Sequence, residues 1–306
     1  MAAEEETSLL VVIIDVNPVW WGQRKLKDEN DLSFSQCIDS LLIFINSHLM
    51  LHHLNKVAVI ASHTNRSQFL YPTREPSPSS QDVDESRYQN IPRDGKYEHF
   101  AKVDDTVFKE VKQLITGQEE ELHSDTLLAG SLAMALCYIH RLEKEAAAGE
   151  KLKPRVLVIK AADDSASQYM DFMNIIFTAQ KQNIVIDACI LDKESGLLQQ
   201  ACDITGGIYL KILQRTGLLQ YLLWVFLPPV KTRSKLALPP AIHVDYRAAC
   251  FCHRTLIDIG YVCSVCLSIF CTFSPICTTC HTAFKFRGPP MRAKKKKKIT
   301  AVENVI

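Results

Sequence analysis

The residues best suited to chemistry are cysteines, and seven of the chain's eleven lie between Cys250 and Cys280. Two CxxC pairs, Cys263 with Cys266 and Cys277 with Cys280, are separated by ten residues. Thiolates three positions apart bind one ion with little strain, and two such pairs complete a tetrahedron around Zn²⁺. An ion with four protein ligands has no position for water, so it organises a surface and performs no chemistry. These four cysteines therefore predict a structural zinc site.

Disulfides and separate buried cysteines are the alternatives. Disulfides need an oxidising compartment, and the acidic N-terminus MAAEEETSLL has neither the basic segment nor the cleavage site of a secretory signal. Scattered packing cysteines fit Cys37, Cys137, Cys189 and Cys202. Seven thiols in thirty-one residues are too dense for that interpretation. Zinc remains the favoured explanation.

A second metal site would have to use Cys250, Cys252 and Cys271, with His253 or His281. The spacing of these residues matches no regular ligand pair. A cross-braced arrangement, in which two ligand sets alternate along the chain, would need a partner two or three residues after Cys271. Phe273 and Ser274 stand there instead. We therefore expect one zinc ion.

Length and charge limit the domain organisation and the kinds of partner that the chain can have. The 306 residues allow one large domain and one small one. A net charge of +1, from 35 basic and 34 acidic residues, argues against a protein that binds nucleic acid over its whole surface. Basic charge gathers instead at Arg292 and 294–298, which favours a nuclear-import signal. Since no apolar run reaches the length of a membrane span, we expect a soluble intracellular protein.

Shifts in composition predict the domain organisation, and no internal repeat is evident. Pro- and Ser-rich residues predict a mobile insertion, a cluster of prolines predicts a linker, and the lysine run predicts a disordered tail. The expected parts are an α/β domain over 1–227 with an insertion at 72–95, a linker over 228–244, a C4-type zinc module over 245–287, and a tail over 288–306.

Strand and helix patterns alternate through the large domain. Leu9–Ile14 is a continuous aliphatic run that ends at Asp15, as expected of a strand buried on both faces. Residues 31–50 have apolar side chains at helical spacing. Further strands are expected at 56–61, 156–159, 184–190 and 208–212, and further helices at 103–115, 126–144, 166–182, 196–202 and in the stretch up to Leu227. This order predicts an α/β fold with a doubly wound, mostly parallel sheet.

Catalytic motifs are not evident in the large domain. The sequence has no GxSxG elbow, Walker lysine or HExxH motif. Asp163 and Asp164 lie at the carboxyl end of a strand, where general acid–base residues could stand, but capping of the next helix by Asp164 or Ser165 is the better explanation. Trp20 and Trp21 follow the first strand, and packing in the core and exposure at a binding rim are equally compatible with that position.

Several strings resemble a von Willebrand factor A domain: VVIIDVNP, DTLLAGSLAMAL and IVIDACILD, with LLQQACDITGGIYL after it. That family often carries a metal-ion-dependent adhesion site built from D-x-S-x-S, a threonine and a later aspartate. Asp15 and Thr126 match it, whereas Asn17 and Val19 replace the serines and Lys160 stands near the expected aspartate. The resemblance therefore implies a degenerate cation site and a domain that acts as a scaffold.

The whole combination resembles the family of thirty-four-kilodalton subunits of the general transcription factor TFIIH. The segments DVNPVWWG, LLAGSLAMALCYIHR and CFCHRTLIDIGYVCSVCLSIFC carry this resemblance. It implies a non-catalytic nuclear subunit of the TFIIH core, which serves transcription initiation by RNA polymerase II and nucleotide excision repair. It also implies binding to the larger TFIIH subunit that combines a von Willebrand A domain with zinc modules, and at most weak or indirect DNA contact.

The zinc module has more apolar residues than so small a unit can bury. We expect Ile257, Ile259, Leu267, Ile269 and Phe270 to form the surface that docks on the partner. Two alternatives are a zinc protein that binds nucleic acid by itself and a RING-like ubiquitin ligase. Salt-sensitive DNA retention would indicate the first, and ubiquitin transfer that depends on an E2 enzyme would indicate the second.

Overall fold

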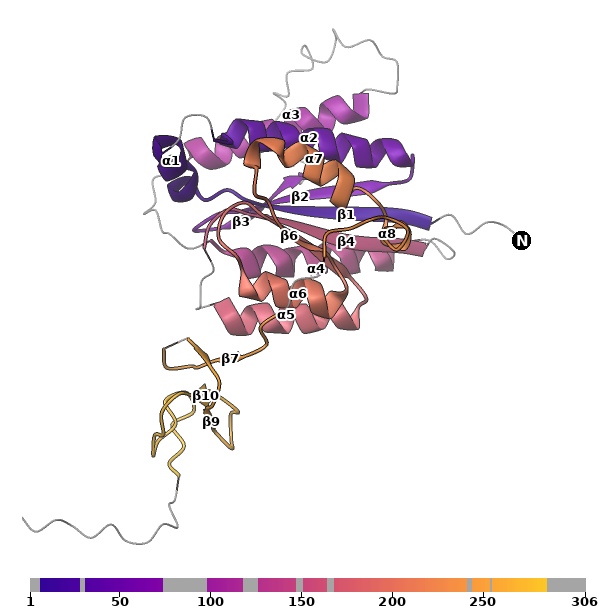
Figure 1. Ribbon diagram of the computed structural model, residues 1–306. Coiled ribbons are helices and arrows are strands. Elements are labelled where there is room, and N and C mark those ends of the chain that lie inside the picture. The colour runs from indigo at the N-terminus through magenta and orange to yellow at the C-terminus, as the bar shows by residue number, and fades with distance from the viewer. Residues whose placement is uncertain are drawn as a thin grey trace, which may run out of the picture. The chain divides into compact units, whose positions relative to one another are not determined.

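The computed structural model describes residues 6–27, 31–73, 98–117, 126–146, 151–163, 168–240, 244–253 and 255–284 (Figure 1). Residues 74–95 of the expected insertion and the basic tail lie outside these ranges. The chain forms two compact units that divide between Tyr246 and Arg247. Each unit is described by itself.

The large unit is built on a six-stranded sheet. Its strands are β1 (Glu6–Asp15), β2 (Lys56–Ser62), β3 (Ser67–Tyr71), β4 (Lys151–Lys160), β5 (Val185–Ile190) and β6 (Tyr209–Lys211), in the order β3-β2-β1-β4-β5-β6. All neighbours pair in parallel except β3, which runs antiparallel to β2 at the edge. This topology confirms the expected doubly wound, mostly parallel sheet.

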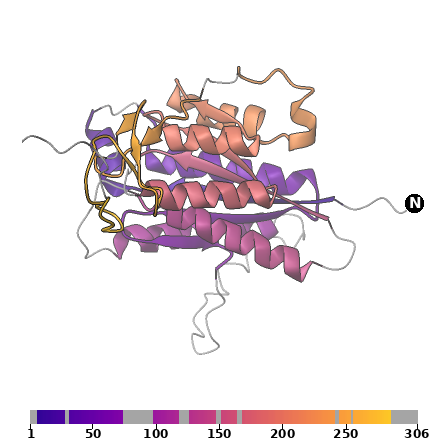
Figure 2. The same ribbon diagram turned by 90° about the horizontal axis from the view of Figure 1, so that it is seen from below.

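Helices cover both faces of this sheet (Figure 1, Figure 2). The first half of the chain contributes α1 (Pro18–Lys27), α2 (Phe34–Leu51), α3 (Glu98–Thr116) and α4 (Leu128–Glu145). The second half contributes α5 (Tyr169–Lys181), α6 (Gly196–Thr205), the 3₁₀ turn η3 (Arg215–Gly217), α7 (Leu218–Tyr221), the π-helical turn η4 (Leu222–Phe226) and α8 (Val230–Arg233). α2, α3 and α7 lie on one face, and α4, α5 and α6 lie side by side on the other.

The central strand β1 is buried on both faces, as its unbroken aliphatic run predicts. Leu10, Val12 and Ile14 pack with α2, α3 and α7, whereas alternate residues such as Leu9 and Val11 pack with α4, α5 and α6. The period of two along a strand places successive side chains on opposite faces. One strand therefore joins two separate apolar cores.

Helix α2 is long and apolar enough to cross a membrane by length and composition alone. Ser33 and Gln36 form a capping box at its start, and its buried residues include Phe44 and Ile45. These side chains belong to the core cluster on one face of the sheet. Its hydropathy therefore reflects packing against the sheet.

In the part of the large unit before Leu227, the structure adds two elements that the sequence does not predict, α1 and β3. Asn17 Oδ1 accepts hydrogen bonds from the backbone N–H groups of Val19 and Trp20, and Pro18 starts α1 with a preset φ. β3 is a five-residue edge strand, too short for a clear alternating pattern. The helix cap expected at Asp164 or Ser165 falls outside the described residues.

The segment 228–244, expected to be a linker, departs from that expectation in its first half, which is folded onto the large unit. It contains α8, whose Arg233 is buried and donates from Nη1 and Nη2 to the two carboxylate oxygens of Asp187 on β5, at 2.7 and 2.6 Å. Farther along, Gln200 Nε2 of α6 donates to the Asp245 carbonyl at 2.7 Å, and Tyr246 contacts Asp203. The large unit therefore extends beyond 227, because these side chains hold the proline-rich segment on it.

The small unit consists of short antiparallel pairs. β7 (Ala248–Ala249) pairs with β8 (Leu256–Ile257), and β9 (Tyr261–Val262) pairs with β10 (Ile269–Phe270). A single bridge joins Ile276 to Ala283. Elements this short cannot form a stable sheet by themselves, so the turns between them must supply the stability.

Candidate metal centres

The three turns of the small unit share one backbone pattern. The N–H groups of Cys250, Cys263 and Cys277 donate to the carbonyls five residues later, those of Thr255, Ser268 and Thr282, at 2.9 Å in each case. The corresponding hexapeptides are CFCHRT, CSVCLS and CTTCHT. They fit the pattern C-x-x-[C/H]-x-[S/T], so the module does contain an internal repeat, contrary to the sequence analysis.

The repeat explains why the two CxxC pairs form ligand turns. Leu267 and His281, at the fifth position of the second and third turns, have φ of 60° and 58°. A left-handed residue there reverses the chain, and the bond back to the first cysteine holds the first and fourth side chains on the same side. His281 takes this backbone role and belongs to neither group of possible ligands in the described chain.

The second and third turns bring the four predicted cysteines together. Cys263 Sγ lies 3.7 Å from Cys280 Sγ, and Cys266 Sγ lies 3.6 Å from Cys277 Sγ. Sulfurs about 2.3 Å from a tetrahedral ion are roughly 3.8 Å apart, whereas a disulfide needs about 2.05 Å. The group therefore has the dimensions of a Zn²⁺ site and excludes a disulfide within it.

The hydroxyl of the last residue of each turn lies within hydrogen-bond distance of a cysteine sulfur. Thr255 Oγ1 lies 3.4 Å from Cys250 Sγ, Ser268 Oγ lies 3.2 Å from Cys266 Sγ, and Thr282 Oγ1 lies 3.2 Å from Cys280 Sγ. The hydroxyl of Ser268 and its backbone N–H lower the pKa of Cys266 to about 6. Thr282 likewise lowers the pKa of Cys280. These contacts favour the thiolate, which is the form that binds metal.

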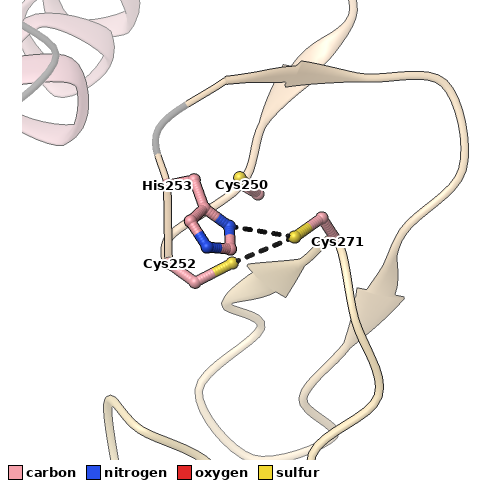
Figure 3. A group of neighbouring side chains, drawn as sticks. All are labelled: Cys250, Cys252, His253 and Cys271. Atoms are coloured by element: carbon pink, nitrogen blue, oxygen red, sulfur yellow. Dashed lines mark hydrogen bonds between the residues drawn. The ribbon is translucent and has the colours of Figure 1, made fainter.

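A second group gathers at the first turn (Figure 3). Cys252 Sγ lies 3.4 Å from Cys271 Sγ, and His253 Nδ1 lies 3.2 Å from the same sulfur. With Cys250, these residues offer four ligand atoms that all lie within 4.8 Å of one another. The irregular spacing of Cys250, Cys252 and Cys271 argues against a second site, and no ligand follows Cys271 at cross-brace spacing, but the structure brings Cys252 to Cys271 from upstream.

The large unit places the residues of the expected degenerate cation site together. Asp15 Oδ1 accepts from Thr126 Oγ1 at 3.0 Å and from the Asn17 N–H at 3.2 Å. Asp15 Oδ2 accepts from the N–H groups of Ala161 and Ala162 at 3.2 and 2.7 Å. A carboxylate has about four acceptor positions, so these hydrogen bonds fill it. Asn17 directs its oxygen to the start of α1 and its Nδ2 to Thr126, at 3.3 Å.

Lys160 supplies the positive charge at this position. Its side chain is buried, and burial lowers its pKa to about 8, against the opposing effect of Asp15 and Asp163. The cavity beside Asp15, Thr126 and Lys160 has a volume of about 10 Å³, room for about one water. Burial raises the pKa of Asp15, and the N–H groups of Ala162 and Ala161 oppose that rise. The arrangement disfavours a hydrated divalent cation, since it contains a lysine and saturated ligands.

The tandem tryptophans divide between core and rim. Trp21 is buried, and its indole N–H donates to the Asp15 carbonyl at 3.0 Å. Trp20 is half-buried, donates to Asp192 at 3.3 Å and carries the Arg24 guanidinium over its ring at 5.5 Å. The two rings meet edge to face, at 87°. The core-packing interpretation is therefore confirmed for Trp21, whereas a role for Trp20 at a binding rim stays a prediction.

The expected docking surface of the small unit is only partly exposed. Ile259 is 86% exposed and Leu267 is 70% exposed, whereas Ile257 and Ile269 are half-buried. Phe270 is 7% exposed and packs in one buried cluster with Cys263 and Cys277. Its inclusion in the docking surface is therefore wrong, because the aromatic ring fills the small core beside the four-cysteine group.

Comparison with known proteins relates both units to one family. The family model described as Transcription factor Tfb4 matches residues 7–281. General transcription and DNA repair factor IIH subunit tfb4 of Schizosaccharomyces pombe is 40% identical over 95% of this chain and 93% of its own length. Subunit TFB4 of Arabidopsis thaliana is 36% identical, over 92% and 90%. A crystal structure of the TFIIH p34 N-terminal domain matches with a TM-score of 0.58 and 33% identity, covering 71% of this chain and 96% of that structure.

Proposed function

The chain belongs to the Tfb4 family of transcription factors, and from this premise we propose that it is a non-catalytic scaffold subunit of the TFIIH core. Its relatives are subunits of a general transcription and DNA repair factor. The proposed role is in transcription initiation by RNA polymerase II and in nucleotide excision repair, in the nucleus. The partner is the larger TFIIH subunit that combines a von Willebrand A domain with zinc modules.

The saturated Asp15 carboxylate carries the proposal that the large unit performs no cation-dependent chemistry. All four of its acceptor positions are used by Thr126 and backbone N–H groups, and Lys160 stands beside it. An adhesion-type site needs carboxylate oxygens that are open to a cation. The large unit then works by presenting surfaces, which is the behaviour expected of a scaffold.

The small unit supplies the docking surface in this proposal. Ile259 and Leu267 project large apolar side chains into solvent, as do Val265 and Ile276. Apolar side chains that a rigid, metal-held frame presents lose little entropy on binding. The zinc ion at Cys263, Cys266, Cys277 and Cys280 would hold this frame and supply structural stability only.

Co-purification of the full chain with the larger subunit tests the surface. A double variant, Ile259→Ser with Leu267→Ser, should reduce recovery of the partner at least tenfold, since two exposed anchors at an interface contribute more than about 1.4 kcal/mol together. Leu26→Ser is the matched control, because Leu26 lies on α1 of the large unit and is 89% exposed. Its complex should form as the wild type does.

The two variants separate the possible outcomes. Loss of the partner with the double variant and not with Leu26→Ser supports docking through the small unit. Full recovery of the partner by the double variant overturns that docking surface. Failure of the wild-type chain to form a stoichiometric complex overturns the scaffold proposal as a whole.

A RING-like ligase is the second candidate, and the order of the possible ligands favours testing it. Cys250, Cys252 and His253 precede the first CxxC pair, and Cys271 lies between the two pairs. The two groups therefore alternate along the chain, as in a cross-brace. Ubiquitin transfer by the purified chain with a panel of E2 enzymes would support this candidate. Absence of transfer, with the partner complex intact, leaves the scaffold.

A further inference from the structure

We propose that Cys250, Cys252, His253 and Cys271 form a second structural zinc centre, so that the small unit is a cross-braced module with two ions. Within the described residues these side chains form one of two groups that offer four ligand atoms. Three thiolates and one imidazole are a common ligand set for structural zinc. The expectation of one ion, drawn from spacing alone, would then be replaced by two.

The repeat of the three turns carries this inference. Turns two and three present the first and fourth residues of C-x-x-[C/H]-x-[S/T] to a common point, as Cys263 with Cys266 and Cys277 with Cys280. The first turn has the same bond, from the Cys250 N–H to the Thr255 carbonyl. Its first and fourth residues are Cys250 and His253, which makes His253 the equivalent of a ligand cysteine.

Cys252 and Cys271 complete the set. The third position of the other two turns is Val265 or Thr279, so a cysteine at this position is peculiar to the first turn. Its sulfur lies 3.4 Å from that of Cys271, which follows directly after β10. The Phe251 N–H donates to the Ile269 carbonyl at 2.7 Å and so holds the first turn against the same strand. Figure 3 shows the thiols and the imidazole turned toward one another.

The distances between these side chains, like the types of ligand, are compatible with a zinc ion. A tetrahedral zinc ion would hold two sulfurs roughly 3.8 Å apart and a sulfur and nitrogen roughly 3.6 Å apart. The observed separations are 3.4 Å between Cys252 and Cys271 and 3.2 Å between His253 Nδ1 and Cys271. Shifts of a few tenths of an ångström in exposed side chains would seat the ion. Binding would displace three thiol protons to solvent and leave His253 neutral with Nδ1 as the ligand atom.

The count of zinc ions per chain is the first test. The full chain is dialysed against metal-free buffer and measured by native mass spectrometry and elemental analysis. We expect two ions in the wild type and one in Cys271→Ser. Cys137→Ser removes one exposed thiol from α4 of the large unit and should keep two ions, so it controls for loss of a thiol alone. One ion in the wild type, or two in Cys271→Ser, would overturn the proposal.

His253→Cys decides the matter even where Cys271→Ser loses both ions by unfolding. The turn pattern accepts cysteine at this position, so the variant should keep two ions. In the cobalt-substituted protein, eight thiolates in place of seven should increase the thiolate-to-cobalt absorption and change the visible bands. The unchanged spectrum of Cys137→Ser is the reference. A His253→Cys spectrum identical to that of the wild type would show that His253 binds no metal and would refute the assigned ligand set.

Discussion

His48 is a buried base whose titration should set the acid sensitivity of the large unit. It lies on α2 at 1% exposure, and burial, helped by the charge of Arg155, lowers its pKa from 6.5 to about 4. Between these values the unfolded chain binds a proton that the folded chain does not bind. The contribution of the neutral His48 side chain to the free energy of unfolding is therefore full above about pH 6.5 and is lost as the pH falls toward 4.

The His48→Leu variant tests this acid limb. From pH 7 to pH 4 the wild type should lose roughly 3 kcal/mol more than the variant, at about 1.4 kcal/mol per unit of pKa. Urea unfolding followed by tryptophan fluorescence measures it, because all three tryptophans belong to the large unit. His53→Leu is the control, since His53 is exposed. Equal pH dependence in the wild type and His48→Leu would contradict the assignment.

The buried ion pair between Arg233 and Asp187 should contribute strongly to the stability of the large unit. Arg233→Met leaves the Asp187 carboxylate with the Ile208 N–H and the nearby charge of Arg155 but without its hydrogen-bonded cation, so we expect a loss of about 3 kcal/mol in the free energy of unfolding. Adding Asp187→Asn should recover much of it. Arg24→Met removes a partly exposed cation from Asp31 and should cost about 1 kcal/mol or less. A similar cost at both arginines would show that burial of the pair is unimportant.

The turn between α6 and β6 shows how an element boundary depends on backbone space. Gly206 ends α6 at φ 72°, and Gly207 passes so close to β5 that a Cβ would lie 1.9 Å from the Ile186 carbonyl oxygen. Gly206→Ala meets open space and should cost about 1–2 kcal/mol for its left-handed conformation. Gly207→Ala forces β5 and β6 apart and should cost about 3 kcal/mol or more. Urea unfolding of both variants measures the order, and a larger cost at Gly206 would contradict it.

Elements with strong patterns were predictable from the sequence. β1, β2, β4 and β5 are runs of aliphatic residues, and burial on both faces requires that composition. α1 and β3 were not predictable, because their periodicity is weak. α1 has ten residues with Trp20 and Trp21 in its first turn, and β3 is an edge strand of five residues. α8 was hidden behind Pro228 and Pro229, because its place in the large unit comes from Arg233 and its distant partner.

The four-cysteine group was predictable as a metal site, whereas the sequence names the residues of the second group but does not predict that they come together, for a reason visible in the turns. CxxC spacing is local, so the spacing of Cys263 and Cys266 indicates a ligand pair without further information. The first turn uses His253 in place of the second cysteine, and Cys271 reaches it only after β10 folds back. Spacing rules compare neighbours along the chain, whereas this group depends on the pairing of β9 with β10.

At the scale of the whole molecule, each of the two units has its own source of internal stability. The large unit has two extensive apolar clusters, on opposite faces of one sheet. Among the described residues of the small unit, the buried apolar cluster comprises Cys263, Phe270 and Cys277, two of which are predicted metal ligands. A unit with so little apolar core depends on its metal for stability. The units should therefore respond independently to removal of metal.

Graded chelation should unfold the small unit alone, and in two steps. The group at Cys252 and His253 is more exposed than the four-cysteine group, in which Cys263 and Cys277 are buried, and it has one thiolate fewer. It should release its ion first. The measurement pairs a chromogenic zinc chelator with tryptophan emission, which should stay constant through both steps because Trp20, Trp21 and Trp224 lie in the large unit. Emission that changes together with zinc release would contradict independent units, and release of both ions in one step would show that the cross-brace loses its metals cooperatively.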